Sequence, residues 1–409
     1  MIGLKTYKYK LYNRNSTKHL DRLFVLSARI YNHCIALNRR YYRRYKKSLN
    51  KYQLQKHLTK LKKQERYKEW NEVPSQAIQD ITDRIDRAYR LFYSNLKVKK
   101  KTSIPHFQKS VKYSSFTTKQ AGYKILDSNK IRIADKIYPY WKSREIEGTI
   151  KTLTVKRTFR GYYIYLVCEQ EVSLPREVTS GNSVGFDFGM KTFLTASDGN
   201  DINIPLFLKI NLNRLRRKSK QFSKLKGRMG SRKSLNKIHE KISNQRNDMH
   251  WKLAHRLTDM YNFLYFETLE LKSMFKSCQK KINDFGFHRF IQILKYVAKQ
   301  KGKIVHFVDK YFPSSKTCSC CGWKNENLKV KDRIFKCDAC GLVQDRDFNA
   351  SLNILREGTS SLMVCDNNSA YAEFCRICPL NPTTSVVEVS QLVSRPEYLY
   401  SAQSQTVST

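Results

Sequence analysis

The chain has 409 residues, of which 40% are apolar, and 78 Lys and Arg against 34 Asp and Glu give it a formal net charge of +44. This length allows two or three domains with cores of their own. The charge favours a polyanionic partner, because each phosphate contact releases condensed counterions. No uncharged apolar run approaches the roughly 18 residues of a membrane span, which argues against a membrane partner.

Charge and cysteine usage vary along the chain. Residues 358–409 carry two Arg against four acidic residues, a net of −2, so the first 357 residues carry +46. This Ser/Thr/Val-rich end predicts a disordered tail. The eleven cysteines are an odd number in a large chain and four have metal-ligand spacing, which favours a reducing compartment. We therefore expect a cytoplasmic, nucleoid-associated protein; its oligomeric state is not given by the sequence.

The first part of the chain predicts a β-rich domain interrupted by helices. Residues 4–12 alternate as a strand does, residues from about 17 to 47 show a helical apolar stripe, and a second helix is expected over 75–93. The basic run 97–101 and Pro105 end that helical block. Strand-like segments follow at 130–137, 149–155 and 161–169.

The second part alternates short strands with helices. Two short strands are expected at 184–189 and 192–196, and residues 212–248 read as a helical hairpin. A buried strand at 263–266, a helix at 287–301 and a strand at 303–308 follow. This order predicts an α/β arrangement that ends in the cysteine-rich segment.

Four cysteines predict a structural zinc site. They form two Cys-x-x-Cys pairs with fifteen residues between the pairs, at Cys318, Cys321, Cys337 and Cys340. Two such pairs supply four thiolates, which is the ligand set of tetrahedral zinc. Buried thiols or disulfides are the alternatives. Cys320 lies between two predicted ligands and is expected to be a bystander.

Three acidic positions at the ends of apolar elements predict a second metal site. Asp187 lies within the segment VGFDFGM, Glu267 directly follows FLYF, and Asp347 with nearby Asp345 precedes a helical pattern. A carboxylate beside apolar residues is costly to desolvate without a compensating cation. If they converge, the three acids could hold two Mg²⁺ ions about 3.5–4 Å apart for phosphodiester chemistry. Each acid taken alone could equally be a turn or cap residue.

Two basic clusters are candidate nucleic-acid contacts. The cluster at 39–47 (RRYYRRYKK) combines charge with stacking rings, and thirteen Lys or Arg stand between Arg214 and Arg246 against the single acid Glu240. Either cluster could instead be a solvated helix face. The candidate contacts are Arg39, Arg40, Arg43, Arg44, Arg214, Arg216, Arg217, Lys218, Lys224, Arg228 and Arg232.

Taken in order, short motifs of this chain resemble the TnpB family of transposon-encoded RNA-guided nucleases, which are related to type V CRISPR effectors. The resemblance covers nearly all of the chain to about Arg356. The motifs are 27–33 (SARIYNH), 73–78 (VPSQAI), 105–108 (PHFQ) with 115–116 (SF), 185–189 (GFDFG), 245–247 (QRN), 267–274 (ETLELKSM), 314–322 (SSKTCSCCG), 335–341 (FKCDACG) and 345–350 (DRDFNA).

The resemblance implies an α+β multidomain fold. A wedge β-barrel domain would comprise 1–14 and 105–180, with a helical recognition domain inserted at 15–104. A RuvC-like, ribonuclease-H-type α/β nuclease domain would comprise 181–312 and 342–357, with a zinc ribbon inserted at 313–341 and the tail at 358–409.

The resemblance also assigns roles to the acids. Asp187 matches the first catalytic acid and Glu267 the second. Asp347 matches the third in preference to Asp345, because the family's aspartate stands two residues before the asparagine, here Asn349. Thr268 and Glu270 replace the more usual Asp and Asn after the second acid, which leaves Glu270 as a possible neighbour of the metal site.

The implied activity is RNA-guided, Mg²⁺-dependent DNA endonuclease chemistry. The guide RNA would derive from the transposon end, and the double-stranded DNA target would lie beside a short adjacent motif that the protein reads while base pairing reads the sequence. Two alternatives stay open: a catalytically silent RNA-guided DNA-binding regulator, and an accessory protein of transposition that joins DNA ends.

Overall fold

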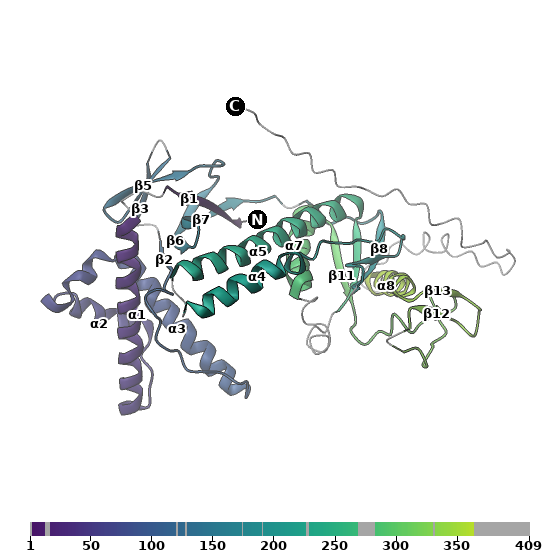
Figure 1. Ribbon diagram of the computed structural model, residues 1–409, viewed down its shortest axis with the longest axis horizontal. Helices are drawn as coiled ribbons and strands as arrows, with labels where there is room; N and C mark the ends of the chain where they lie inside the picture. Colours follow the sequence, from purple (N-terminus) through teal and green to yellow (C-terminus); the bar gives the residue numbers. More distant parts are fainter. Residues whose placement is uncertain are drawn as a thin grey trace. The chain divides into compact units, whose positions relative to one another are not determined.

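The computed structural model describes residues 2–12, 17–119, 122–126, 129–173, 175–189, 191–225, 229–268, 283–329 and 332–363. The chain forms two compact units (Figure 1). The first comprises residues 1–177, 205–256 and 283–302, and the second comprises 178–204, 257–282 and 303–409. Within these described ranges, no helix is long and apolar enough to cross a membrane.

A seven-stranded antiparallel sheet, curled into a nearly closed barrel, forms the base of the first unit. Its spatial order is β2-β6-β7-β1-β5-β4-β3. Near the open edge, the Tyr123 hydroxyl donates to the Ile150 carbonyl across the barrel. The strands are β1 (Ile2–Leu11), β2 (Ser115–Thr118), β3 (Tyr123–Leu126), β4 (Lys130–Ile133), β5 (Lys136–Trp141), β6 (Thr149–Thr158) and β7 (Gly161–Glu171).

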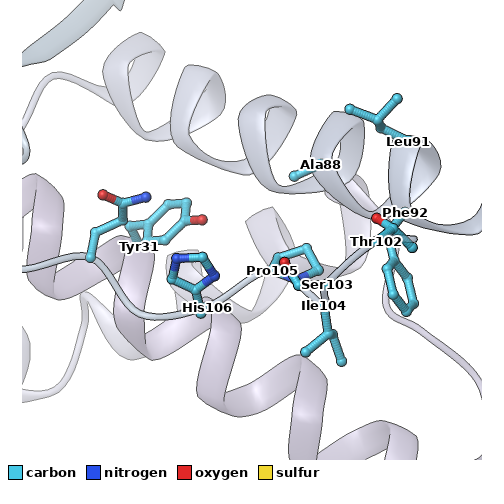
Figure 2. A pocket seen from close by; sticks show the side chains of 10 residues that line it. Tyr31, Ala88, Leu91, Phe92, Thr102, Ser103, Ile104, Pro105 and His106 are labelled. Atoms are coloured by element: carbon cyan, nitrogen blue, oxygen red, sulfur yellow. The ribbon is translucent and has the colours of Figure 1, made fainter. Parts of the chain in front are cut away.

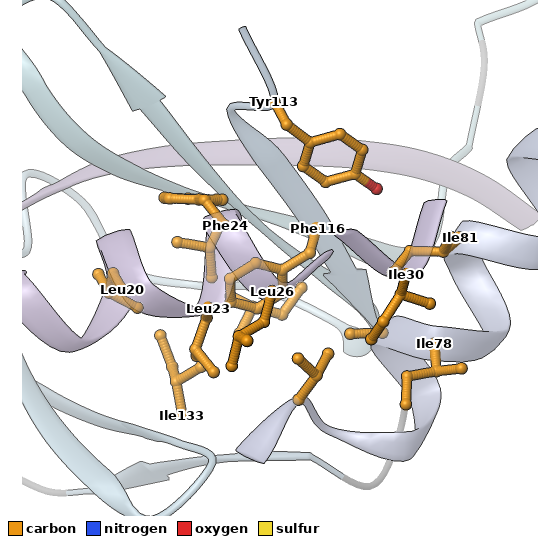
Figure 3. Packing of buried hydrophobic residues seen from close by; sticks show 14 of the residues in the cluster. Leu20, Leu23, Phe24, Leu26, Ile30, Ile78, Ile81, Tyr113, Phe116 and Ile133 are labelled. Atoms are coloured by element: carbon orange, nitrogen blue, oxygen red, sulfur yellow. The ribbon is translucent and has the colours of Figure 1, made fainter. Parts of the chain in front are cut away.

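Alternating side chains fill the barrel. Along β1, Tyr7, Tyr9 and Leu11 are buried while the lysines between them are exposed, as expected where one strand face meets the core. Figure 3 shows residues of helix α1 (Thr17–Tyr45), including Phe24, packed against Phe116 of β2. Their ring centroids lie 5.4 Å apart.

Helices separate β1 from the other barrel strands in the sequence, which agrees with the predicted helical insertion. They are α1, α2 (Lys51–Leu61), the 3₁₀ helix η1 (Glu65–Glu72) and α3 (Ser75–Lys97). Asn50 and Gln53 form a capping box at the start of α2. α3 runs four residues past its predicted end at 93.

The first unit also contains α4 (Phe207–Lys224), α7 (Phe287–Gln300) and α5 (Met229–Met260) as far as residue 256. The predicted helical hairpin therefore begins earlier and ends later than 212–248. The Asp284 carboxylate accepts hydrogen bonds from the backbone N–H groups of Leu208 and Lys209 at 2.8 and 2.9 Å. Arg160, in the turn between β6 and β7, forms an ion pair with Glu240 of α5 at 3.0 Å.

The second unit is built on a four-stranded sheet of order β11-β10-β8-β9. Strands β8 (Ser183–Asp187), β10 (Phe263–Glu267) and β11 (Ile304–Val308) are parallel, and β9 (Thr195–Ala196) is antiparallel to β8. Helix α8 (Arg346–Met363) lies against this sheet (Figure 1). A two-stranded sheet of β12 (Ile334–Lys336) and β13 (Val343–Asp345) precedes α8.

Two glycines allow α8 to lie close to the sheet. A Cβ atom at Gly185 of β8 would stand 2.3 Å from the Ser351 carbonyl oxygen, and one at Gly358 would stand 2.3 Å from the Tyr265 ring. Real Cβ atoms do not approach other heavy atoms this closely. Any larger residue at Gly185 or Gly358 must therefore push the helix and the sheet apart.

The predicted start of the tail at residue 358 is wrong by six residues. α8 continues to Met363, Thr359 is buried and donates to the Leu355 carbonyl at 2.8 Å, and the Ser361 hydroxyl lies 2.9 Å from His306 Nε2. The burial of Thr359 and the contact of Ser361 with His306 of β11 keep a Ser/Thr-rich segment helical. Residues 364–409 lie outside the described residues, and the remaining domain boundaries stay predictions.

Candidate active site and metal centre

The four predicted cysteines meet at one point. The Sγ atoms of Cys318, Cys321, Cys337 and Cys340 all lie within 4.8 Å of one another, with separations of 3.6 Å for Cys318–Cys340 and 3.5 Å for Cys321–Cys337. Tetrahedral Zn–S bonds of about 2.3 Å would hold sulfur atoms about 3.8 Å apart. The cluster can therefore hold a metal ion such as zinc. Cys320 is exposed and is not part of the group.

Each cysteine pair lies on a turn of the same design. The Gly322 N–H donates to the Cys318 carbonyl, and the Gly341 N–H donates to the Cys337 carbonyl. Both glycines have positive φ angles, +80° and +74°, which residues with a Cβ rarely adopt. Phe335 is fully buried beneath the two turns, next to Trp323, Leu328 and Leu342. With so small a core, a metal ion bound by the four cysteines would supply much of the ribbon's stability.

Asp187 and Glu267 lie at the same edge of the four-stranded sheet. Each is the last residue of its strand, and the register pairs the preceding residues, Phe186 and Phe266, on neighbouring parallel strands about 4.8 Å apart. The rings of Phe186 and Phe266 stack on one face. Because side chains alternate along a strand, Asp187 and Glu267 project from the opposite face.

Helix α8 covers that opposite face and carries Asp347 in its first turn. Gly185, two residues before Asp187, contacts Ser351 of α8, and Tyr265, two residues before Glu267, contacts Gly358. Asp347 lies near enough to Asp187 for their charges to interact. The fold thus brings the three predicted acids to one end of the sheet.

Electrostatics at this edge favour a cation. Burial raises the pKa of Asp187 well above its usual range, and the negative charges of Glu267 and Asp347 raise it further. Burial also raises the pKa of Glu267, against a 3.4 Å hydrogen bond that its Oε2 accepts from the Ser314 hydroxyl. Three carboxylates that repel one another are hard oxygen donors, which suits Mg²⁺.

Arginines partly balance the acids. Arg346 donates to Asp347 Oδ1 at 3.1 Å and also lowers the pKa of Asp187, while Arg333 Nη1 lies 3.7 Å from Asp347 Oδ2.

Within the part of the chain that the structure describes, only the cysteine quartet has its ligand atoms within 4.8 Å of one another. The acids are therefore less tightly gathered than the thiols.

Asp345 and Asp347 have different structural roles. Asp345 is exposed, and its Oδ1 accepts hydrogen bonds from the backbone N–H groups of Asp347 and Phe348 at 2.9 and 3.1 Å, the pattern of a helix N-cap. The side chain of Asp347 is 20% exposed and faces Arg346 and Arg333. This geometry favours Asp347 as the third acid of the site.

Comparison with known proteins shows which families and proteins this chain is similar to. Two family models match successive segments: one described as "Probable transposase" matches residues 165–278, and one described as "Cas12f1-like, TNB domain" matches residues 287–354. A protein of Streptomyces pristinaespiralis named "Putative RNA-guided DNA endonuclease" is 27% identical over 369 residues, covering 87% of this chain and 90% of that protein. The "TnpB-like protein L79" of Acanthamoeba polyphaga mimivirus is 29% identical over 201 residues, covering 43% of this chain and 37% of its own length.

The chain is therefore similar to proteins named TnpB-like and to proteins named as putative RNA-guided DNA endonucleases.

A solved structure shares the fold. The Cas12f1 chain in a complex with sgRNA and target DNA superposes with a TM-score of 0.54, covering 84% of this chain and 83% of that chain, at 16% sequence identity. At this identity the likeness concerns the fold. The shared fold is a mixed arrangement of helices and sheets.

The predicted nucleic-acid contacts differ in their surroundings. Arg39 is half-buried, donates to the Pro105 carbonyl at 2.8 Å and lies 4.8 Å from the Phe107 ring centre, so it holds the 105–107 segment against α1. The other predicted contacts on α1, Arg40, Arg43 and Arg44, are exposed to solvent. On α4, which has no buried residue, Arg214, Arg216, Arg217 and Lys224 are exposed, whereas Lys218 and, on α5, Arg232 are half-buried. Arg228 and Glu270 lie outside the described residues.

A cavity of about 260 Å³ lies in the first unit between α1, α3 and the segment 102–108. Figure 2 shows Tyr31, Leu91, Phe92 and His106 around it. No carboxylate, lysine or arginine lines it, so it offers neither a charged metal ligand nor a phosphate clamp.

Sequence reasoning missed several residues around the acids. Ser314, Arg346, Asn349 and Asn353 contact the candidate site or the cysteine turns. Asn349 and Asn353 stand four residues apart on α8, so they share one helix face. Two asparagines four residues apart, in a segment with a helical pattern, were the available sequence signal.

Proposed function

We propose that this protein is an RNA-guided DNA endonuclease that hydrolyses phosphodiester bonds with two Mg²⁺ ions held by Asp187, Glu267 and Asp347. The observation that carries the proposal is the placement of these three acids at one edge of the sheet, where burial and mutual repulsion raise the pKa of Asp187. The names of the relatives agree with this activity. A second such relative, InsQ of Escherichia coli, is 26% identical and covers 71% of this chain and 76% of its own length.

The strand order supports a RuvC-like, ribonuclease-H-type domain. Three parallel strands with one antiparallel neighbour, in the order β11-β10-β8-β9, place the ends of β8 and β10 beside the start of α8. Two acids at strand ends and a third on the covering helix then face one substrate position. The proposed catalytic residues thus come from three segments that are far apart in the chain.

Bound Mg²⁺ would activate a water molecule and stabilise the leaving oxygen of the phosphodiester. The chain's own contribution is to orient the three carboxylates and to shield them partly from water, while Arg346 lowers the pKa of Asp187 against the effect of burial. Ser314 donates to Glu267 and thereby fixes one carboxylate oxygen. Arg346 and Arg333 lie beside Asp347, where they could also contact a phosphate oxygen of the substrate.

The exposed arginines of α1 and the basic face of α4 are proposed to bind the backbones of guide RNA and DNA. Such contacts carry no sequence information, so recognition would rest on base pairing and on a short adjacent motif. A guide derived from the transposon end and a zinc ion in the four-cysteine ribbon complete the proposal.

The first test is to express the protein with its native flanking DNA, purify it and sequence the RNA that accompanies it. A discrete RNA ending at a transposon boundary is expected, and the complex should cut matching DNA only with Mg²⁺. Asp187→Asn and Glu267→Gln should abolish cutting while RNA still binds. Heterogeneous RNA and no cutting by the unaltered chain would instead favour the silent binding protein.

A further inference from the structure

Helix α8 contacts the first cysteine turn through two fully buried asparagines. The Asn349 Nδ2 group donates to the Thr317 carbonyl at 2.7 Å, and Asn349 Oδ1 accepts from the Ser319 N–H at 2.9 Å. Thr317 and Ser319 flank Cys318 on both sides. One amide therefore holds the backbone on either side of a proposed zinc ligand.

Asn353, one helical turn later, extends the same contact. Its Nδ2 group donates to the Thr317 carbonyl at 2.6 Å and to the Ser314 carbonyl at 2.8 Å. Gln344 of β13 joins from the other side, because its Nε2 donates to Asn349 Oδ1 and to the Ser319 hydroxyl, both at 2.7 Å. The first cysteine turn and β13, which pairs with β12 of the ribbon, thus converge on α8.

The same contacts end at the candidate catalytic acids. Asn349 is two residues beyond Asp347 in the first turns of α8. Ser314, whose carbonyl binds Asn353, uses its hydroxyl to donate to Glu267 Oε2 at 3.4 Å. The path from the cysteine turn to each acid is therefore only a few residues long and runs entirely within the second unit.

We infer that Asn349 and Asn353 are positioning residues, which couple the folded four-cysteine ribbon to the placement of Asp347 and Glu267. The inference rests on the proposed function of those acids. When the ribbon loses its metal, the backbone around Cys318 is no longer held, and the amides lose the partners that fix the start of α8. The acids then lose the geometry that binds a divalent cation.

A purely structural role for the asparagines would look different. A buried amide is expensive to leave without partners, so these residues could simply stabilise the ribbon. In that case their replacement would lower the stability of the protein or its zinc retention but would leave cation binding by the still-folded chain unchanged. Cation affinity therefore separates the two roles.

The test measures Mn²⁺ binding to the full chain by electron paramagnetic resonance and zinc content by mass spectrometry. Asn353→Asp replaces a donor that faces two carbonyl oxygens with an acceptor. It should weaken Mn²⁺ binding by at least tenfold, and stripping zinc from the unaltered protein should do the same. Thr359→Val, which removes one buried hydrogen bond on the same helix away from the ribbon, should change neither reading.

If Asn353→Asp does not fold, as judged by circular dichroism, Ser314→Ala removes only the hydroxyl that contacts Glu267 and should weaken Mn²⁺ binding by a smaller factor. Wild-type Mn²⁺ affinity in folded Asn353→Asp, or in folded zinc-stripped protein, would overturn the inference. The inference would also be overturned if the unaltered chain bound no Mn²⁺, or bound it no more tightly than Asp187→Asn does. An unaltered chain that binds Mn²⁺ but cuts no DNA would refute the proposed function and leave the coupling intact.

Discussion

Asp345 Oδ1 accepts a hydrogen bond from the backbone N–H of Asp347 at 2.9 Å, so one aspartate caps the helix that presents the other. The two residues are separated only by Arg346, yet Asp345 is exposed whereas Asp347 lies among arginines at the end of the sheet. Their proximity in sequence conceals a division of labour between helix capping and proposed metal binding.

Substitutions at these two positions should therefore affect different properties: stability at Asp345 and DNA cutting at Asp347. Asp345→Asn keeps an oxygen that can cap α8 and should leave both stability and DNA cutting nearly unchanged, whereas Asp345→Ala should lower the free energy of unfolding by about 0.5–2 kcal/mol. Asp347→Asn should abolish cutting without a comparable loss of stability. Denaturant unfolding and a cleavage assay measure both. Full activity in Asp347→Asn together with its loss in Asp345→Asn would reverse the assignment.

Much of the fold and of the candidate site could be predicted from the sequence. The apolar run before Glu267 predicted a strand that ends there, and cysteine spacing predicted a quartet, because both signals are local. The strand expected at 184–189 instead ends at Asp187. The contacts of Ser314 with Glu267 and of Asn353 with Ser314 join residues 47 and 39 positions apart, so no local pattern records them. The helical segment around Thr359 was mistaken for tail because its Ser/Thr-rich composition is overridden by tertiary burial.

The buried carboxyl of Asp187 should make stability depend on pH in the direction opposite to that of a salt-bridged acid. Its folded-state pKa is raised, so the folded state holds the proton more tightly than the unfolded state does. Ionising this buried carboxyl lowers the free energy of unfolding. The loss of stability is absent below the ordinary pKa of about 4, grows as pH rises towards the folded-state pKa and is constant above it.

Without divalent cations, Asp187→Asn should therefore raise the melting temperature at pH 7–8, and this gain should vanish near pH 4. Added Mg²⁺ should stabilise the unaltered protein but not the variant, since ligand binding to the folded state alone shifts the unfolding equilibrium. Calorimetry at several pH values provides the measurement, with Asp345→Asn as an exposed-acid control. A variant that melts lower at neutral pH would contradict the raised pKa.

Zinc removal should unfold the ribbon at 313–341. Its buried apolar core is small, and metal binding supplies much of the stability of such modules. Cys321→Ser or a strong chelator should expose the amides around Phe335 and Cys337 to rapid hydrogen exchange. Cys320→Ser is the matched control, because its thiol is exposed and outside the quartet. Unchanged exchange after verified zinc loss would mean that the ribbon folds without metal.

Gly185 should be intolerant of a side chain. A Cβ atom there would meet the Ser351 carbonyl oxygen at 2.3 Å and the Leu355 nitrogen at 2.6 Å, both backbone atoms of α8. Gly185→Ala should therefore cost about 1–3 kcal/mol of stability, as overpacking typically does, and should reduce cutting by displacing Asp347. Gly230→Ala is the control, since a Cβ atom at that position would meet no described heavy atom within 4 Å. Equal stability of the two variants would show that α8 does not lie so close to β8.

The exposed basic face of α4 should contribute uniformly to nucleic-acid affinity. The combined change of Arg214, Arg216, Arg217 and Lys224 to Gln removes four exposed charges from a helix with no buried residue, so folding should be preserved. Each lost phosphate contact should reduce the slope of log affinity against log salt by about 0.7–0.9.

Lys252→Gln on α5 is a single-charge control, because that lysine already pairs with Asp248 at 2.8 Å. Titration of RNA binding across salt concentrations gives the slope. An unchanged slope in the quadruple variant would mean that α4 faces solvent in the complex, and the backbone contacts would then have to be sought on Arg40, Arg43 and Arg44 of α1.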